Sequence, residues 1–124
     1  MNRRDIDILE RILCYCGEIR EAQDRFGNTL EALKSDSIYR NAVAMCILQI
    51  GELTNHLTDD FKVSHGKIPW QKIKGMRDIA AHHYGKFDTD IMFNTITERI
   101  PELLNYCSEV LNESAESEPK ALEI

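Results

Sequence analysis

The sequence predicts an all-α protein, organised as an up-and-down bundle of four principal helices. Apolar residues recur at spacings of three and four along most of the chain, which is the period of an amphipathic helix. No stretch shows the strict alternation of apolar and polar residues that is typical of a half-buried strand. Glycines and helix-capping residues divide the helical stretches and leave only short connections between them, as an up-and-down bundle requires.

The first helix is predicted over residues 4–26. Its apolar stripe is spaced at three and four residues and contains Ile6, Leu9, Leu13 and Cys16. Gly27 follows directly and is expected to end the helix. Residues 29–34 are expected to add a short helical turn before the next long segment.

The second long helix is expected to begin at Asp36 or Ser37, since both residue types are good N-caps, and to reach about Leu57. Gly51 lies inside this helix, where a glycine costs about 1 kcal/mol relative to alanine. We therefore expect another helix backbone to approach closely at Gly51. Glu52 beside it is either directed toward residues 77–84 or simply exposed to solvent, and the sequence leaves both readings open.

The third helix is predicted between Pro69 and Gly85. Proline fits the first helical turn, where its missing N–H costs nothing, and glycine readily adopts the positive φ that closes a helix. The preceding residues 58–67 contain two aspartates and a glycine, and we interpret them as a loop.

Asp88 or Thr89 is expected to cap the last helical segment. Pro101 lies inside this segment and removes one backbone donor, so it should kink the helix or split it in two. The apolar positions of the segment are Met92, Ile96, Ile100, Leu103, Cys107 and Val110. Residues 1–113 are thus predicted to form one helical domain, and the acidic residues 114–124 a disordered tail.

Composition agrees with a single globular domain of 124 residues, of which 43% are hydrophobic and 29% charged. No run approaches the roughly 20 apolar residues that span a membrane, and the N-terminus lacks a signal-peptide pattern, so we expect a cytoplasmic location without membrane attachment. The four cysteines form no CxxC pair and lack histidines at zinc spacing. They are expected to be buried reduced thiols, and we predict neither a metal site nor a cofactor.

The net charge of −6 at first argues against a nucleic-acid partner. The charge is unevenly distributed, however. Between residues 61 and 87 six lysine or arginine residues accompany a single aspartate, a net charge of +5, so the remainder of the chain carries −11. Such a block suits a local phosphate-facing patch, although a solvated lysine face on a short helix would have the same composition.

The basic block contains the densest group of chemically versatile side chains, which are Arg77, Asp78, His82 and Tyr84. Asp78 and His82 are one helical turn apart and can touch. Arg77 and His82 diverge by about 140° around the helix. A site that uses both residues therefore requires the long arginine side chain to extend around the helix, or a second copy of the helix across a two-fold axis. On residue types alone, this pattern is more often an ordinary ion pair on a helical bundle.

The pattern Arg77-Asp78-x-x-x-His82-x-Tyr84 resembles the Arg-(Asn/Asp)-x-x-x-His-x-Tyr signature of HEPN-domain RNases, and specifically the HepT-like toxin family. The likeness covers roughly residues 3–111. Asp78 stands where the family more often has asparagine. Three flanking motifs agree with the family pattern, namely Ile50-Gly51-Glu52, Ile68-Pro69-Trp70 and Pro101-Glu102-Leu103.

The resemblance implies a HEPN-like helical homodimer that cleaves RNA without a metal. His82 would be the general acid and base, and Arg77 would clamp the phosphate. Asp78 would fix the tautomer of His82 and stabilise its imidazolium. The family also implies an antitoxin partner, a cognate minimal nucleotidyltransferase, which would neutralise the toxin by adding AMP to Tyr84.

Neighbouring side chains are expected to help bind RNA. They are Lys72, Lys74, His83 and Lys86. Two other classes of function remain open, a non-catalytic HEPN-like module that binds a nucleotide or a partner, and a plain interaction bundle. The intact Arg-Asp…His-x-Tyr set favours the ribonuclease.

Overall fold

All regular structure in the described part of the chain is helical, which confirms the predicted all-α class. The structure is a computed structural model that describes residues 1–82 and 88–117, without the side chains of residues 82 and 115–117. Its elements are α1 (Arg3–Phe26), α2 (Leu30–Ser35), α3 (Ser37–Asn55), α4 (Asp59–Ser64), α5 (Trp70–His82), α6 (Thr89–Asn94), the π-helical turn η2 (Thr95–Arg99) and α7 (Ile100–Ser117).

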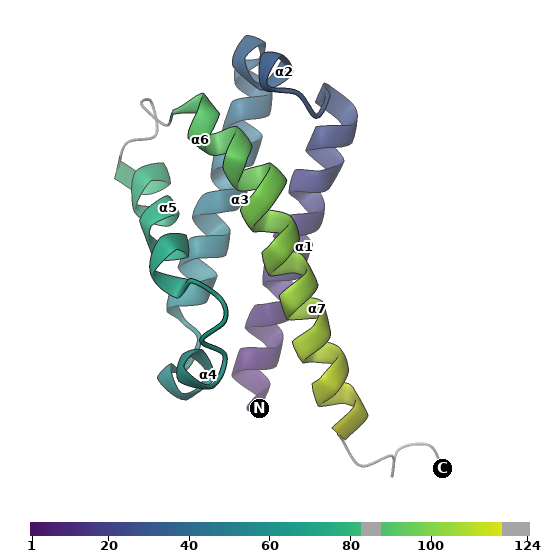
Figure 1. The fold of residues 1–124 in the computed structure, drawn as a ribbon, viewed down its shortest axis with the longest axis vertical. Helices are drawn as coiled ribbons and strands as arrows, with labels where there is room; N and C mark the ends of the chain where they lie inside the picture. Colours follow the sequence, from purple (N-terminus) through teal and green to yellow (C-terminus); the bar gives the residue numbers. More distant parts are fainter. Residues whose placement is uncertain (83–87, 118–124) are drawn as a thin grey trace.

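The long helices lie side by side, and successive ones run in opposite directions (Figure 1). α1 is followed by α3, α5 and the continuous α6–η2–α7 run, while the short helices α2 and α4 lie at opposite ends of the molecule. α7 continues past residue 113, where the sequence predicted the domain to end. None of the described helices is long and apolar enough to cross a membrane.

Local sequence signals account for the ends of the first helices. Asn2 caps α1 by accepting a hydrogen bond of 2.8 Å from the Asp5 N–H, and Gly27 ends the helix with a φ of 106°. Thr29 caps α2, and Asp36 caps α3. The predicted stop at residue 27 and the predicted cap at residue 36 are both confirmed.

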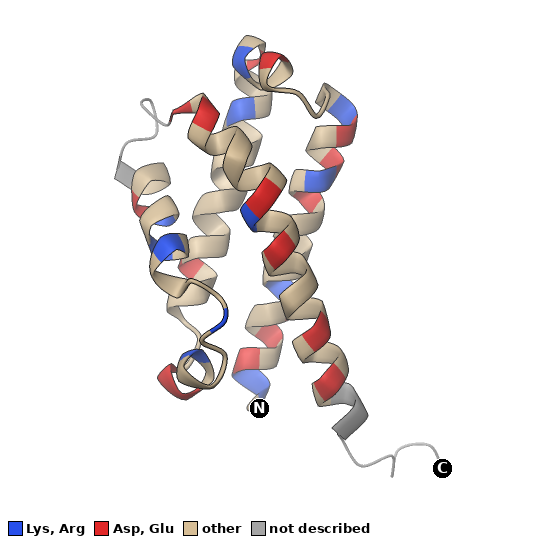
Figure 2. Ribbon diagram, in the orientation of Figure 1, with Lys and Arg blue, Asp and Glu red and all other residues tan. Residues whose placement is uncertain are grey.

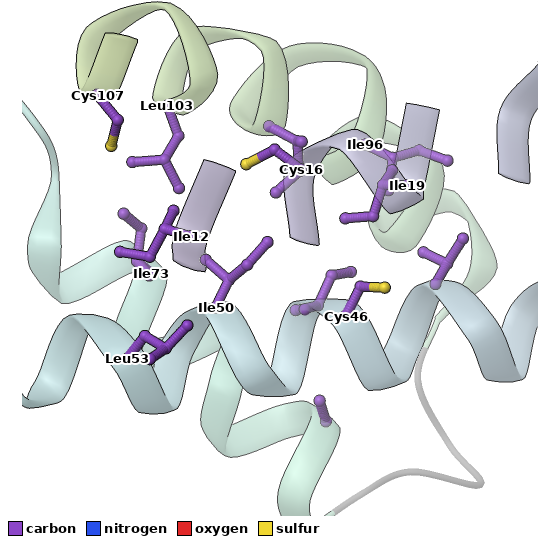
Figure 3. Packing of buried hydrophobic residues seen from close by; sticks show 14 of the residues in the cluster. Ile12, Cys16, Ile19, Cys46, Ile50, Leu53, Ile73, Ile96, Leu103 and Cys107 are labelled. Atoms are coloured by element: carbon purple, nitrogen blue, oxygen red, sulfur yellow. The ribbon is translucent and has the colours of Figure 1, made fainter. Parts of the chain in front are cut away.

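The core lies where α1, α3 and α7 meet, and Ile73 and Ala80 of α5 are also buried in it (Figure 3). Its buried members include Ile12, Ile19, Ile50, Leu53, Ile73, Ile96 and Leu103. Removing such side chains from water supplies most of the driving force for folding. Three cysteines also lie in this core, Cys16, Cys46 and Cys107. Cys14 is exposed, so the prediction of four buried thiols was wrong at that position.

Residues 58–67 were predicted to be a loop, and this prediction was wrong because α4 forms there. Thr58 caps the helix by accepting a 3.2 Å hydrogen bond from the Phe61 N–H. The buried carboxylate of Asp5 in turn accepts bonds of 3.0 and 2.8 Å from the Thr58 N–H and hydroxyl. Phe61 is buried, and it is the single apolar side chain with which α4 enters the core.

The last helical run adapts to Pro101 by a π turn. At the end of η2 the N–H of Ile100, the first residue of α7, donates to the carbonyl of Thr95, five residues earlier. In this register the next carbonyl, that of Ile96, faces Pro101, which has no N–H to donate. The side-chain amide of Gln23 on α1 lies 3.5 Å from that carbonyl oxygen and donates to it instead.

Candidate active site

The site is built where α5 lies against α3. A methyl group added at Gly51 would come within 2.1 Å of the Arg77 Cβ, 2.6 Å of its Cγ and 3.2 Å of its Cα. Only a glycine at this position therefore lets α5 come so near. The predicted close approach at Gly51 is confirmed, and the residue that approaches is the motif arginine itself.

The guanidinium of Arg77 is held by two carboxylates. Its Nε donates to Glu52 Oε1 at 2.5 Å, and its Nη2 pairs with the same oxygen. Its Nη1 donates to Asp78 Oδ1 at 2.9 Å. The hydrogen bonds with Asp78 and then with Glu52 raise the pKa of Arg77 above its already high ordinary value. Of the two readings of Glu52, the structure supports the one directed toward the motif.

The three charged side chains are partly open to solvent. The exposed fraction is 25% for Arg77, 37% for Glu52 and 48% for Asp78. Two carboxylates and one guanidinium give this group a formal charge of −1. The guanidinium can nevertheless meet a ligand at the surface, because it has five N–H donors and the described contacts use three of them.

Asp78 was expected to orient His82, and this expectation stays untested; among the described side chains, the carboxylate of Asp78 accepts a hydrogen bond from Arg77. His82 is the last residue of α5, and its side chain lies outside the described part of the chain. His83, Tyr84 and Lys86 lie wholly outside it. Their predicted roles therefore stay predictions.

The two described lysines of the predicted RNA-binding set are both exposed on α5. Lys74 is three residues before Arg77 and shares its side of the helix, whereas Lys72 is five residues before it and points about 140° away. Lysine and arginine predominate on α5 and on the connection before it, α4 carries charges of both signs, and most charged residues of α6 and α7 are acidic (Figure 2). The structure thus brings Lys74 beside the arginine and leaves Lys72 further round the helix.

The described geometry suits the binding of a phosphate or another oxyanion. Planar guanidinium groups bind such oxygens through paired N–H bonds, and a neighbouring lysine adds positive charge. Among the described residues, no three His, Cys, Asp or Glu side chains gather in an arrangement that could hold a metal ion.

Comparison with known proteins shows which family the sequence of this chain resembles. A family model described as "Ribonuclease HepT-like" matches residues 6–110. A protein named "Putative RNase" from Caldanaerobacter subterraneus subsp. tengcongensis is 34% identical over 103 residues, covering 83% of this chain and 90% of the relative. A "Probable ribonuclease HepT" from Thermococcus cleftensis is 32% identical over 105 residues, covering 83% of this chain and 92% of the relative. No solved structure is a significant match.

Proposed function

This chain belongs to the family of HepT-like ribonucleases, and from that premise we propose that it is the metal-independent RNase toxin of a toxin–antitoxin pair. Its family makes it a ribonuclease, and the proposal concerns how it cuts RNA and what restrains it. The observation that carries the proposal is the partly exposed guanidinium of Arg77. It lies on the same helix as His82 and inside the basic block of the chain.

In the proposed reaction the RNA supplies its own nucleophile. A ribose 2′-hydroxyl gives its proton to His82 while its oxygen bonds to the adjacent phosphorus. The bond from phosphorus to the 5′-oxygen of the next nucleotide breaks, and a histidine returns a proton to that oxygen. The products are a 2′,3′-cyclic phosphate and a free 5′-hydroxyl. Arg77 binds the phosphate oxygens and stabilises the charge that develops on them.

The test is RNA cleavage with EDTA present, by the wild-type protein and by His82→Ala and Arg77→Ala. We expect the wild type to cut and each variant to lose at least about 100-fold in rate, the usual size of an acid–base or phosphate-clamping contribution. Arg25→Ala is the matched control, because Arg25 is an exposed arginine on α1 whose ion pair with Glu21 contributes little.

Abolition of cutting by EDTA would refute the metal-independent mechanism. Full activity in His82→Ala would reassign the acid and base. RNA left intact by the wild type at every salt concentration would instead favour the alternative, a non-catalytic HEPN-like module that binds a nucleotide or a partner.

We also propose that the active form is a homodimer of HEPN-like four-helix bundles, with both motif helices near the two-fold axis. The support is the divergence of about 140° between Arg77 and His82 on one helix, which a second copy of α5 would overcome. Light scattering should give twice the chain mass of 14.3 kDa at micromolar concentration. A monomer alone under these conditions would refute the shared site.

The proposed restraint is AMP addition to Tyr84 by a cognate minimal nucleotidyltransferase in the cytoplasm. The phenolic oxygen of Tyr84 would attack the α-phosphate of ATP and release pyrophosphate. Tyr84 and Arg77 are seven residues apart, so if α5 continued to residue 84 they would share one stripe, and the added negative charge would compete with RNA for the arginine. Incubation with the partner and ATP should raise the intact mass by one or more AMP units, and peptide mapping should place them on Tyr84. Modification of another tyrosine would refute this assignment.

A further inference from the structure

We propose that Glu52 is a positioning residue, which holds one edge of the Arg77 guanidinium so that another edge is presented to the RNA phosphate. This inference rests on the proposed role of Arg77 as the phosphate clamp. Glu52 belongs to α3 and Arg77 to α5, so the contact joins two helices and fixes the arginine relative to the body of the fold.

The hydrogen bonds identify the edge that is held. The Nε and Nη2 groups of Arg77 both donate to a single oxygen of Glu52, Oε1. Asp78 takes one N–H of Nη1. One N–H on Nη1 and one on Nη2 have no partner among the described residues. Two donors on neighbouring nitrogens are what a guanidinium needs to bind two phosphate oxygens together.

The first methylene groups of the Arg77 side chain are held in place, as well as its guanidinium. Gly51, next to Glu52, lets the α3 backbone press against the Cβ and Cγ of Arg77. With both ends of the side chain held by α3, fewer rotamers are open to Arg77 before RNA binds. A clamp arranged in advance avoids the loss of side-chain entropy that a free arginine would suffer on binding.

The same contact has an electrostatic cost. Glu52 brings a negative charge against the group that binds an anion, so it should weaken the binding of RNA while improving the geometry of the bound complex. A residue that only stabilised the fold would not separate these two effects. Moreover, a partly exposed ion pair contributes little to stability. The signature of a positioning role is therefore a fall in kcat without a rise in KM.

The experiment compares Glu52→Ala and Glu52→Gln in RNA cleavage over a range of RNA concentrations, together with thermal unfolding. Glu52→Ala should lower kcat by about 10- to 100-fold, the size expected from misplacing a catalytic group by about 1 Å, and KM should stay equal or fall. Glu52→Gln should recover kcat to within about threefold of wild type, because one amide oxygen can accept both bonds that Oε1 accepts now. Its KM should fall, because the negative charge is gone.

Glu10→Ala on α1 is the control for loss of an exposed acid, and Arg77→Ala tests the underlying function in parallel. If Arg77→Ala is inactive but Glu52→Ala keeps the wild-type kcat, the positioning role is overturned and the phosphate clamp stands. If Arg77→Ala cuts as well as wild type, the clamp itself fails, and the role of Glu52 fails with it. If Glu52→Gln is as impaired in kcat as Glu52→Ala, the geometric explanation is wrong.

Discussion

Gly51→Ala offers the sharpest test of how the two motif-bearing helices are packed. The added methyl would lie 2.1 Å from the Arg77 Cβ and 3.2 Å from its Cα, and neither atom can move away by a rotamer change. Carbon atoms in contact normally lie about 3.5–4.0 Å apart, so α3 and α5 would have to separate by roughly 1.5 Å. The perturbation therefore acts on the backbone and not only on a side chain.

The expected magnitude follows from two opposing terms. Overpacking of this kind costs about 3 kcal/mol or slightly more, and alanine in place of glycine returns about 1 kcal/mol of helix propensity. We expect the free energy of unfolding to fall by about 2 kcal/mol. For a domain of this size that corresponds to a drop in Tm of roughly 6–10 °C. Cleavage should also fall, because Arg77 would be carried away from Glu52.

Thermal and urea unfolding measure the effect, and the chain supplies matched controls. Gly17 and Gly75 also lie inside helices, but a methyl group at either position meets nothing within 4 Å. Gly17→Ala and Gly75→Ala should therefore leave stability unchanged or raise it by up to about 1 kcal/mol. A Gly51→Ala protein as stable as these controls would show that α3 and α5 are not packed as described.

Three further predictions concern the rest of the fold. Asp5→Ala leaves the Thr58 N–H and hydroxyl without their acceptor, so urea unfolding should show a loss of about 2 kcal/mol, and an unchanged midpoint would contradict the tie between α1 and α4. A thiol reagent should modify Cys14 alone in the native protein and all four cysteines in denaturant, and a second fast thiol before unfolding would count against the core described above. Burial raises the pKa of Cys16, Cys46 and Cys107 from 9.0 to about 12, so the unfolded chain releases these protons at lower pH than the folded one. Stability should be complete below pH 9 and fall between pH 9 and 12, and a flat unfolding midpoint across that window would refute this linkage.

The sequence predicted those helices whose ends carry their own chemical signals. Gly27 and Asp36 each act through the backbone of their immediate neighbours, so pattern alone locates them. α4 was not predicted because it contributes a single side chain to the core, Phe61, and one apolar position shows no helical period. The N-cap residue of α4, Thr58, donates its hydrogen bonds to Asp5, which is 53 residues away in the sequence. A local sequence pattern cannot indicate so distant a partner.

The sequence likewise predicted some features of the candidate site and could not establish others. The motif marks Arg77 without any structure, and Gly51 gave the signal that a helix comes close there. Helical spacing permits a contact between Asp78 and His82, which stays a prediction, but it does not indicate the observed bond from Arg77 to Asp78, because neighbours in sequence do not normally face each other on a helix. The bond from Glu52 to the arginine joins two helices, so spacing along either one could suggest the contact but not establish it.

The position of α5 in the bundle has a consequence for how the site moves. α5 packs chiefly against α3, whereas α3 is also covered by α1 (Figure 1). A helix secured mainly along one side opens locally at a lower free energy than one enclosed by several neighbours. In native-state hydrogen exchange, the amides of α5 should therefore exchange before those of α3 and by an opening smaller than global unfolding. α5 can thus open and reclose while the core formed by α1, α3 and α7 stays folded.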